Sequence, residues 1–305
     1  MHIGSAPHLF CFGLGYSAYA LCNRLSEEGW IISGTCRNEE TRQRLKAHGF
    51  RMYLFDRDRP LQAPAEKFAC VTDILISIPP DADGDPVLDL HRHHILEHPR
   101  LRWIGYLSST GVYGDTGGAL LDETAPLRPT SERSRRRVAA ELAWLELHRA
   151  HRSPVVSFRL AGIYGPGRNA LEQVLAGKAK RIERPGHLFS RIHVDDIATI
   201  LRASLARTHP GHAYNVCDDK PAAPADVVAF ASELLGVPPP PLIPFAEAQR
   251  QMSPMASSFW RDNRRIDNSR IKRELGVVLA YPDYRAGLTA IAAGLRPDER
   301  EMAAI

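Results

Sequence analysis

The sequence predicts an α/β protein in which a doubly wound parallel sheet is followed by a smaller C-terminal lobe. Short apolar runs alternate with helical patterns through the first half of the chain, which is typical of βαβ units and a parallel sheet. A glycine-rich turn separates the first apolar run from the first helical pattern. The alternation stops after residue 159, where loops and a proline tract follow. At 305 residues the chain is long enough for two structural units.

Each element of the sheet domain is predicted from one run or one pattern. The apolar runs predict strands at residues 9–12, 31–36, 51–55, 74–78, 102–108 and 155–159. The helical patterns predict helices at residues 16–28, 39–48, 86–97 and 132–149. We therefore assign residues 1–160 to the sheet domain and residues 161–305 mainly to the second lobe, which we expect to be interleaved with the sheet.

Composition narrows the class of partner. The net charge is +4 in a chain that is 24% charged, too mild a bias for a nucleic-acid platform or a membrane-surface protein, so we expect a small-molecule partner. No stretch approaches the ~18 apolar residues of a membrane span. The five cysteines are widely spaced and include no C-x-x-C pair, which favours free thiols in a reducing cytoplasm.

The glycine-rich turn has the pattern G-x-G-x-x-A, with Gly13, Gly15 and Ala18 at its fixed positions and Tyr16 and Ser17 between the last two. In this pattern the first glycine allows a tight turn, the second lets backbone amides approach a pyrophosphate, and the small third residue lets the helix pack closely on the strand. Because a strand precedes the motif and a helix follows it, we predict a Rossmann-type dinucleotide-binding domain.

Residues at the ends of later strands indicate which dinucleotide is bound. An NAD-preferring domain has Asp or Glu about twenty residues after the glycines, whereas this chain has Arg37. A guanidinium suits a 2′-phosphate, so we predict NADP, with NAD as the less favoured cofactor. Asp56 could accept from the adenine amine or cap a turn. Ile76, Ser77 and Ile78 end the fourth strand, where we expect the nicotinamide side of the site.

Three further segments carry a family resemblance. They are Leu-Ser-Ser-Thr-Gly-Val-Tyr-Gly at 107–114, Arg-Leu-Ala-Gly-Ile-Tyr-Gly-Pro-Gly at 159–167 and Arg-Ile-His-Val-Asp-Asp at 191–196. With the glycine motif they resemble extended short-chain dehydrogenases/reductases of the NAD-dependent epimerase/dehydratase family, in its atypical, YeeZ-like branch. The resemblance spans nearly the whole chain. It implies a nucleotide-binding lobe and a substrate lobe over the nicotinamide, with Ala161 among the cofactor-binding residues.

The resemblance also implies where the catalytic residues lie. Ser109 matches the catalytic Ser/Thr of the family, but Arg133 and Arg137 occupy the positions of its Tyr-x-x-x-Lys pair. An arginine stays protonated, so Arg133 cannot act as the proton donor, whereas Arg137 could still bond a nicotinamide ribose. Being four residues apart on one helix face, the two guanidinium groups could bind an anionic substrate or simply begin a solvated basic helix.

The remaining candidates for proton transfer are Tyr113, Tyr164 and His193, although we interpret each first as a packed structural residue. A histidine cluster at residues 91, 93, 94 and 98 has spacing that metal sites use. We interpret it as a solvated helix and expect no metal.

The sequence thus predicts a cytoplasmic NADP-dependent oxidoreductase or epimerase that lacks the usual Tyr-x-x-x-Lys pair and acts on a small polar carbonyl or sugar compound. The alternative is a catalytically inactive NADP(H)-binding regulatory or redox-sensing protein. An apolar stripe of Ala140, Trp144 and Leu147 could pair with a second subunit or pack on its own sheet, so a homodimer is possible.

Overall fold

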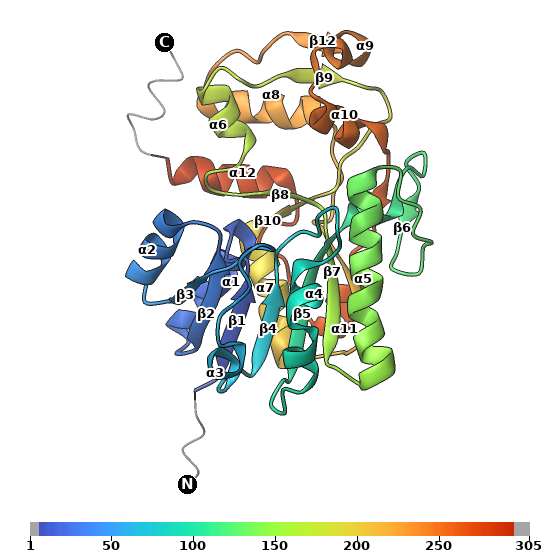
Figure 1. The fold of residues 1–305 in the computed structure, drawn as a ribbon. Coiled ribbons are helices and arrows are strands. Elements are labelled where there is room, and N and C mark those ends of the chain that lie inside the picture. The colour runs from blue at the N-terminus through green and yellow to red at the C-terminus, as the bar shows by residue number, and fades with distance from the viewer. Residues whose placement is uncertain (1–5, 296–305) are drawn as a thin grey trace.

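The computed structural model describes residues 6–295, except for the side chains of residues 254, 255 and 258. Its centre is a seven-stranded sheet, with all strands parallel, in the order β11-β7-β5-β4-β1-β2-β3 (Figure 1). The strands are β1 (His8–Phe12), β2 (Ile31–Cys36), β3 (Arg51–Leu54), β4 (Asp73–Ile76), β5 (Trp103–Ser109), β7 (Val155–Leu160) and β11 (Ala213–Val216). The order reverses between β1 and β4, as in a doubly wound Rossmann sheet. The predicted fold class is confirmed, but the six predicted strands omitted β11.

Helices cover both faces of this sheet. One face packs against α1 (Tyr16–Glu27), α2 (Glu39–Ala47), α7 (Val194–Ala206) and α11 (Ser269–Leu275). The other packs against α3 (Pro64–Phe68), α4 (Pro86–Leu96) and α5 (Glu132–His151). All four predicted helices are present, with ends within two residues of those expected.

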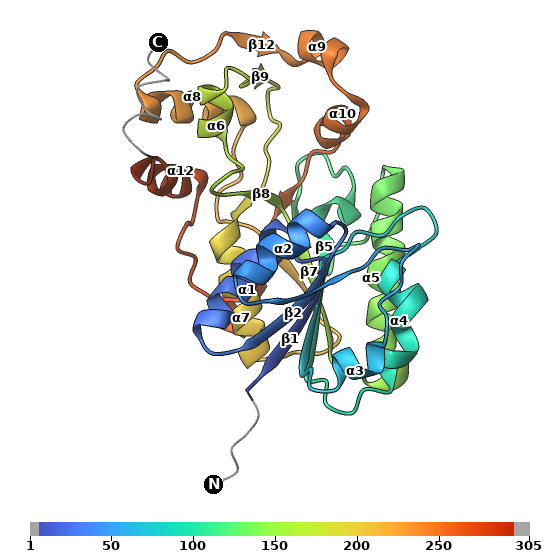
Figure 2. The ribbon, with the colours of Figure 1, turned by 60° about the vertical axis from the view of Figure 1, so that its left-hand side comes forward.

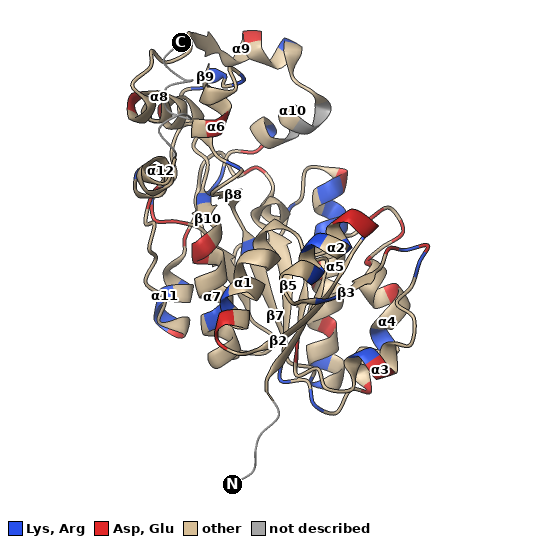
Figure 3. Cartoon of the chain, turned by 90° about the vertical axis from the view of Figure 1, so that its left-hand side faces the viewer, with Lys and Arg blue, Asp and Glu red and all other residues tan. Residues whose placement is uncertain are grey.

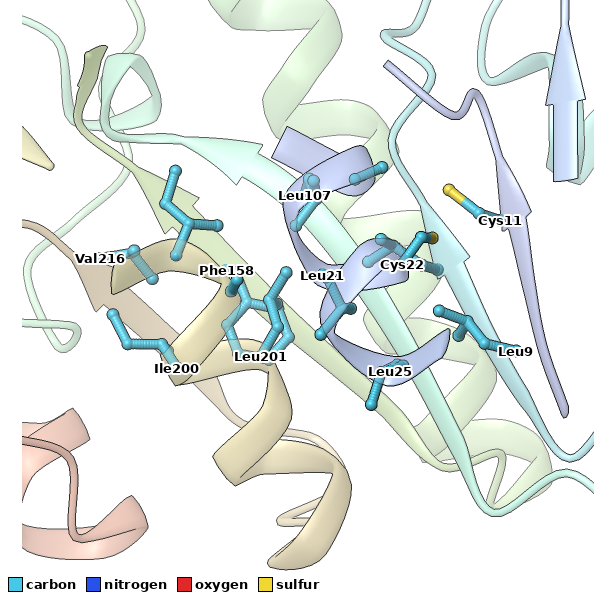
Figure 4. Close-up of a cluster of buried hydrophobic side chains, with 14 of the residues drawn as sticks. Leu9, Cys11, Leu21, Cys22, Leu25, Leu107, Phe158, Ile200, Leu201 and Val216 are labelled. Carbon is cyan, nitrogen blue, oxygen red and sulfur yellow. The ribbon is translucent and has the colours of Figure 1, made fainter. Parts of the chain in front are cut away.

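The side chains of β1 alternate between the two faces of the sheet, so this short strand contributes to the hydrophobic core on each face. Leu9 and Cys11 are buried with Leu21 of α1 and Leu201 of α7, on the side drawn in Figure 4. The residue Phe10, between them, points to the opposite face, where its ring meets Phe68 edge-on at 5.0 Å between centroids. A strand buried on both faces is apolar at every position because successive side chains alternate between the faces.

The second lobe stands over the carboxyl edge of the sheet (Figure 2). Its core packs α6 (Ala170–Leu175) and α8 (Pro224–Leu235) against α12 (Tyr284–Ala293). Its other helices are α9 (Phe245–Ala248), the 3-10 helix η2 (Gln249–Gln251) and α10 (Pro254–Arg261). Two-stranded parallel ribbons join β8 (Gly162–Tyr164) to β10 (Arg191–His193), β9 (Arg181–Glu183) to β12 (Leu242–Pro244), and β6 (Leu120–Leu121) to β13 (Arg265–Ile266).

The chain after residue 161 contributes elements to both the lobe and the sheet domain. It builds the lobe, but it also returns to the sheet to supply β11, α7 and α11. Asp196 of α7 connects that helix to the segment between α11 and α12, since its carboxylate accepts from the amides of Ala280 and Tyr281 at 2.8 and 3.0 Å. The predicted ranges 1–160 and 161–305 include residues 1–5 and 296–305, which lie outside the described residues.

The apolar stripe on α5 faces the chain's own sheet. Ala140, Trp144 and Leu147 are buried in the core that also contains Tyr106, and the Trp144 indole donates to the Asp85 carboxylate at 3.0 Å. The stripe is therefore used within one subunit, and a homodimer remains a prediction.

Charged residues of both signs occur together on the surface, and the cysteines form no disulfide. Basic and acidic segments are mixed along α4 and α11 (Figure 3). Within residues 6–295, no helix has both the length and the apolar character needed to cross a bilayer. All five cysteines are free thiols, and Cys70 is exposed whereas the other four are buried.

Candidate active site

The glycine turn begins where β1 ends. Gly13 has a φ of +81°, a left-handed conformation that glycine adopts without strain. Its amide donates to the Thr35 hydroxyl at 2.9 Å, and the next amide, that of Leu14, donates to the Thr35 carbonyl at 2.9 Å. A Cβ atom on Gly13 would lie 2.6 Å from the Ile78 side chain. The turn is thus fixed against both β2 and the loop after β4.

Helix α1 starts immediately after this turn. Gly15 is its N-cap residue and supplies no side-chain hydrogen bond to the first turn. The amides of a helix N-terminus and the positive end of its dipole form a ready site for phosphate groups. Gly15 is also exposed, so backbone amides are accessible at the predicted pyrophosphate position.

A cavity of about 720 Å³ opens in front of these residues. We call it the sheet-edge cavity, because the ends of β1 to β4 form its walls. Of the predicted cofactor residues, those lining it are Gly13, Gly15, Tyr16, Ser17, Arg37, Asp56, Ser77 and Ile78. Ala18 and Ile76 are fully buried beneath it. The predicted site therefore comes together from segments more than sixty positions apart in the sequence.

The Arg37 guanidinium and the Asp56 carboxylate, which both line the sheet-edge cavity, differ in whether they have an ion-pair partner. Arg37 is exposed, and its side chain forms no hydrogen bond or ion pair with any residue in the described range. The Asp56 carboxylate, in contrast, accepts from Arg59 at 2.7 Å, and Arg59 also donates to the Arg37 carbonyl at 2.7 Å. The cation predicted to bind a phosphate is free, whereas the carboxylate predicted near the adenine is partly neutralised.

Ion pairs cross the rim of the same cavity. Arg57 donates to Asp81 from Nε at 2.7 Å and from Nη2 at 2.8 Å. Its Nη2 also lies 2.9 Å from Asp89 of α4. These pairs connect the loops that follow β3 and β4.

A second cavity of about 390 Å³ lies between the sheet and the lobe. We call it the lobe cavity. Its sheet side is formed by Ser109, Thr110 and Ala161. Its lobe side includes Arg191, Trp260, Asp262 and Arg264, with Leu188, Phe189 and Phe259 among its apolar walls. Since β4 and β5 are adjacent strands, the two cavities open at neighbouring positions along one sheet edge.

Ser109 ends β5 at the lobe cavity. Its hydroxyl accepts from the Gly111 amide at 3.1 Å and caps the 3-10 helix η1 (Thr110–Tyr113). The hydroxyl proton has no acceptor among residues 6–295, nor has that of Thr110. Both hydroxyl groups can therefore donate to a molecule in this cavity.

The structure separates the two candidate tyrosines. Tyr113 is fully buried outside the lobe cavity; its hydroxyl donates to Asn215 at 2.7 Å and accepts from Arg159 at 2.7 Å. Tyr164 lines the lobe cavity, but its hydroxyl donates to the Asp283 carbonyl at 3.3 Å. Burial raises the pKa of Tyr164 above its ordinary value. Neither hydroxyl group faces the predicted substrate as a free proton donor.

His193 is also engaged structurally. It is buried, its Nδ1 accepts from the Asp195 amide at 3.2 Å, and its ring lies 4.0 Å from that of Tyr281. Burial lowers the pKa of His193 below its ordinary value. This histidine packs where the sheet layer joins the lobe.

The two arginines predicted at the family's Tyr-x-x-x-Lys positions differ in exposure and in hydrogen bonding. Arg133 is exposed and is not among the lining residues of either cavity. Arg137 turns toward the sheet, where it donates to the Leu107 carbonyl at 2.9 Å and to the Tyr106 hydroxyl at 3.3 Å. The two guanidinium groups therefore have different surroundings, and their joint binding of one anion stays a prediction.

Sequence reasoning missed the charged residues that the lobe supplies. Arg168 reaches the sheet-edge cavity, and Asp262 and Arg264 reach the lobe cavity. They lie in loops with no local motif, so only the packing of the lobe brings them to the site. Tyr16 gives a second link, since its hydroxyl donates to the Pro166 carbonyl at 2.8 Å.

The predicted histidine cluster has mixed surroundings, with three members on α4 and His98 just beyond its end. His91 is buried against the rings of Phe12 and Phe55, and burial lowers its pKa to about 4. His98 lies 2.6 Å from the Phe68 carbonyl. These two side chains thus serve packing and a backbone contact, whereas the exposed His93 lies 2.9 Å from Glu97. Elsewhere His209, His212 and Glu274 lie close enough to share a cation, but Arg270 donates to both Glu274 and His212.

The residues of the sheet-edge cavity fit a dinucleotide. A helix N-terminus without a side-chain cap, an exposed glycine beside it and a free arginine at the end of β2 provide amides, room and positive charge for phosphate groups. The cavity volume lies in the range of small-molecule sites, roughly 300–1,000 Å³. Fold and site together define a Rossmann-type α/β protein with a second lobe over the carboxyl edge of its sheet.

Comparisons with known proteins find similarity to one family. The model of the NAD-dependent epimerase/dehydratase family matches residues 93–217. A solved conserved protein of unknown function from Silicibacter pomeroyi is 46% identical, with a TM-score of 0.85 over 95% of this chain and 99% of that one. The protein YeeZ of Escherichia coli K12 is 29% identical over 283 residues, 89% of this chain and 95% of YeeZ. Residues 93–217 of this chain thus match the NAD-dependent epimerase/dehydratase family, and the chain is similar to YeeZ over most of its length.

The dTDP-glucose 4,6-dehydratase of Bacillus anthracis, solved in complex with NAD, shares the fold. It is 18% identical, with a TM-score of 0.76 over 94% of this chain and 96% of that one. The likeness extends to the arrangement of sheet and lobe.

Proposed function

We propose that the protein is an NADP(H)-dependent oxidoreductase or epimerase acting on a small polar carbonyl or alcohol compound. The observation that carries the cofactor preference is the pairing of charges in the sheet-edge cavity. Arg37 is free to bind a 2′-phosphate, whereas Asp56 is already paired with Arg59. The match of residues 93–217 to the epimerase/dehydratase family model supports the oxidoreductase chemistry.

In this proposal each part of the chain has a binding role. Gly13 and Gly15 let the first amides of α1 contact the diphosphate, and Arg37 pairs with the 2′-phosphate. Ser77 and Ile78 flank the nicotinamide. The bound dinucleotide supplies or accepts a hydride at its nicotinamide ring. Ser109 donates to the substrate oxygen, and the proton passes to or from water, since the described tyrosine hydroxyl groups near the cavity are engaged.

The cofactor preference can be measured by calorimetric titration with NADPH, NADP⁺, NADH and NAD⁺. We expect tighter binding of the phosphorylated pair in the wild-type protein and a loss of about tenfold to a hundredfold, for that pair alone, in Arg37→Ala, as for one charge-assisted contact. Arg44→Ala is the matched control, because Arg44 is an exposed arginine of α2 that is not among the cavity's lining residues. Equal weakening of all four ligands would contradict the role of Arg37.

The second candidate is a regulatory protein that binds NADP(H) without turning over a substrate. It is favoured by one observation: the two Tyr-x-x-x-Lys positions hold Arg133, which is exposed, and Arg137, which is bonded to the end of β5. A partner protein captured only at a high NADPH/NADP⁺ ratio, with no turnover across a panel of carbonyl compounds, would favour this candidate. Turnover of any member of the panel would favour the enzyme.

A further inference from the structure

The lobe cavity is rich in hydrogen-bond donors. Arg264 uses Nη1 to donate to the Gly114 carbonyl at 3.1 Å and to Asp262 at 3.0 Å. Its Nη2 has no acceptor among residues 6–295. Ser109 and Thr110 add hydroxyl groups whose protons are also free.

These donors gather on one side of the cavity. A Cβ atom placed on Gly111 would lie 3.4 Å from the Ser109 hydroxyl oxygen and 4.0 Å from Nη2 of Arg264. The same Cβ atom would lie 3.1 Å from the Ser134 hydroxyl oxygen, so both groups approach Gly111 closely from the side of the lobe cavity. A ligand that bonds Ser109 through one oxygen is within reach of the guanidinium through another.

The charge of the cavity wall is positive. Arg191 and Arg264 contribute two guanidinium groups, and Asp262 contributes one carboxylate. That carboxylate is committed on both oxygens, to Arg264 and to the Thr130 hydroxyl at 2.7 Å. Arg191 is committed through Nη1 to the carbonyls of Phe189 and Ala222. A molecule that complements this wall is an acceptor with negative charge.

The rest of the wall is apolar and aromatic. Trp260 lies parallel to His187 at 5.5 Å and edge-on to Phe189 at 5.3 Å between ring centroids. Trp260 and Phe189 both line the cavity. Such a surface favours a flat or branched apolar body attached to the charged group.

We propose that the substrate is a small carbonyl compound bearing a carboxylate, with Arg264 binding the carboxylate and Ser109 and Thr110 binding the carbonyl oxygen. This inference rests on the proposed function for the reaction, but it concerns binding. A carboxylate is favoured because a volume of about 390 Å³ accommodates a compact ligand, and because one free guanidinium edge matches one small anion. It also assigns a function to Arg264, which lies more than 150 positions from Ser109 in the sequence.

The test uses the full-length protein saturated with NADP⁺ and two probes that differ only in charge. Benzoylformate has an aromatic body, a ketone and a carboxylate, whereas methyl benzoylformate has the carboxylate masked as an ester. We expect calorimetry to give a dissociation constant at least tenfold lower for the acid. Arg264→Gln should remove that difference, whereas Arg265→Gln, which alters the exposed neighbouring arginine outside the cavity lining, should preserve it.

Two further measurements keep the result interpretable. Dinucleotide binding is titrated separately for every variant, so that loss of the cofactor is distinguished from loss of the carboxylate site. If Arg264→Gln does not fold, Arg264→Lys replaces it, and we expect weaker but still charge-dependent binding. Probe binding that persists when NADP⁺ does not bind would support the carboxylate site and overturn the proposed cofactor role.

Three outcomes would overturn the proposal. They are equal affinity for acid and ester, unchanged affinity for the acid in a folded Arg264 variant, and displacement of the acid by inorganic phosphate at lower concentration than by acetate. The last would assign the guanidinium to a phosphate-bearing ligand.

Discussion

Arg159 donates two hydrogen bonds to one carboxylate oxygen of Glu141, from Nε at 2.9 Å and from Nη2 at 2.7 Å. Both side chains are nearly inaccessible to solvent, at 7% and 0% exposure. Ser108 donates to the other oxygen of Glu141, and Nη1 of Arg159 donates to the Tyr113 hydroxyl. One buried polar network thus joins β5, α5, β7 and η1 directly beneath the lobe cavity.

Glu141→Gln should destabilise the protein strongly. The change leaves the Arg159 guanidinium buried without its counter-charge, and breaking a buried pair in this way costs about 3–5 kcal/mol of unfolding free energy. The matched control is Glu146→Gln on the exposed face of α5, where an ion pair with Arg149 is worth about 0–1 kcal/mol. Urea unfolding of the two variants tests this, and similar losses in both would contradict the role of the network.

Tyr113→Phe should lower stability without changing dinucleotide affinity. Loss of the hydroxyl leaves Arg159 and Asn215 each short of one buried partner, for a cost of about 1–3 kcal/mol. Tyr19→Phe is the control, because the Tyr19 hydroxyl makes an exposed 3.4 Å contact with His48. Unfolding free energy and NADP⁺ titration are measured on both variants. Unaltered stability of Tyr113→Phe, combined with loss of turnover on any substrate found, would instead assign this tyrosine to the chemistry.

Asp218→Asn should change the pH dependence of stability. Burial raises the pKa of Asp218 to about 8 in the folded protein, against about 3.9 in an unfolded chain. Between these values the folded state holds a proton that the unfolded state has released, so this group makes the wild-type protein less stable as pH rises from about 4 to about 8. Asparagine does not titrate. The variant should therefore gain stability relative to wild type across that range.

Thermal unfolding at several pH values between 4.5 and 8.5 measures this difference. Asp226→Asn, at an exposed position in α8, should give a curve parallel to that of wild type. A curve for Asp218→Asn that is also parallel would show that the carboxyl does not titrate in this range.

The sheet was predictable from sequence where a strand is a continuous apolar run with clear ends. Residues 31–36 lie between Gly29 and Arg37, and the predicted limits match β2. In contrast, β11 has four residues, Ala213–Val216, and pairs with β7 more than fifty positions earlier. The strands β3 and β4 are equally short but lie within the regular alternation of strands and helices, whereas β11 lies beyond it and is defined by its partner.

The site was predictable where its residues follow strand ends. Gly13, Arg37 and Ser77 reach one cavity because parallel strands end at the same edge. Arg264 was not predictable, because only the packing of the lobe brings it to Ser109. Tyr113 follows Ser109 in a motif that suggests a shared site, but the 3-10 turn directs its hydroxyl into the Arg159 network instead.

The ion pairs of Arg57 with Asp81 and Asp89 have a consequence for kinetics. All three side chains are only partly buried, at 26%, 39% and 41% exposure, so dissolved ions weaken their attraction. The loops after β3 and β4 are then held together less firmly as ionic strength rises. The residence time of a ligand in the sheet-edge cavity should shorten accordingly, even where none of its own contacts changes.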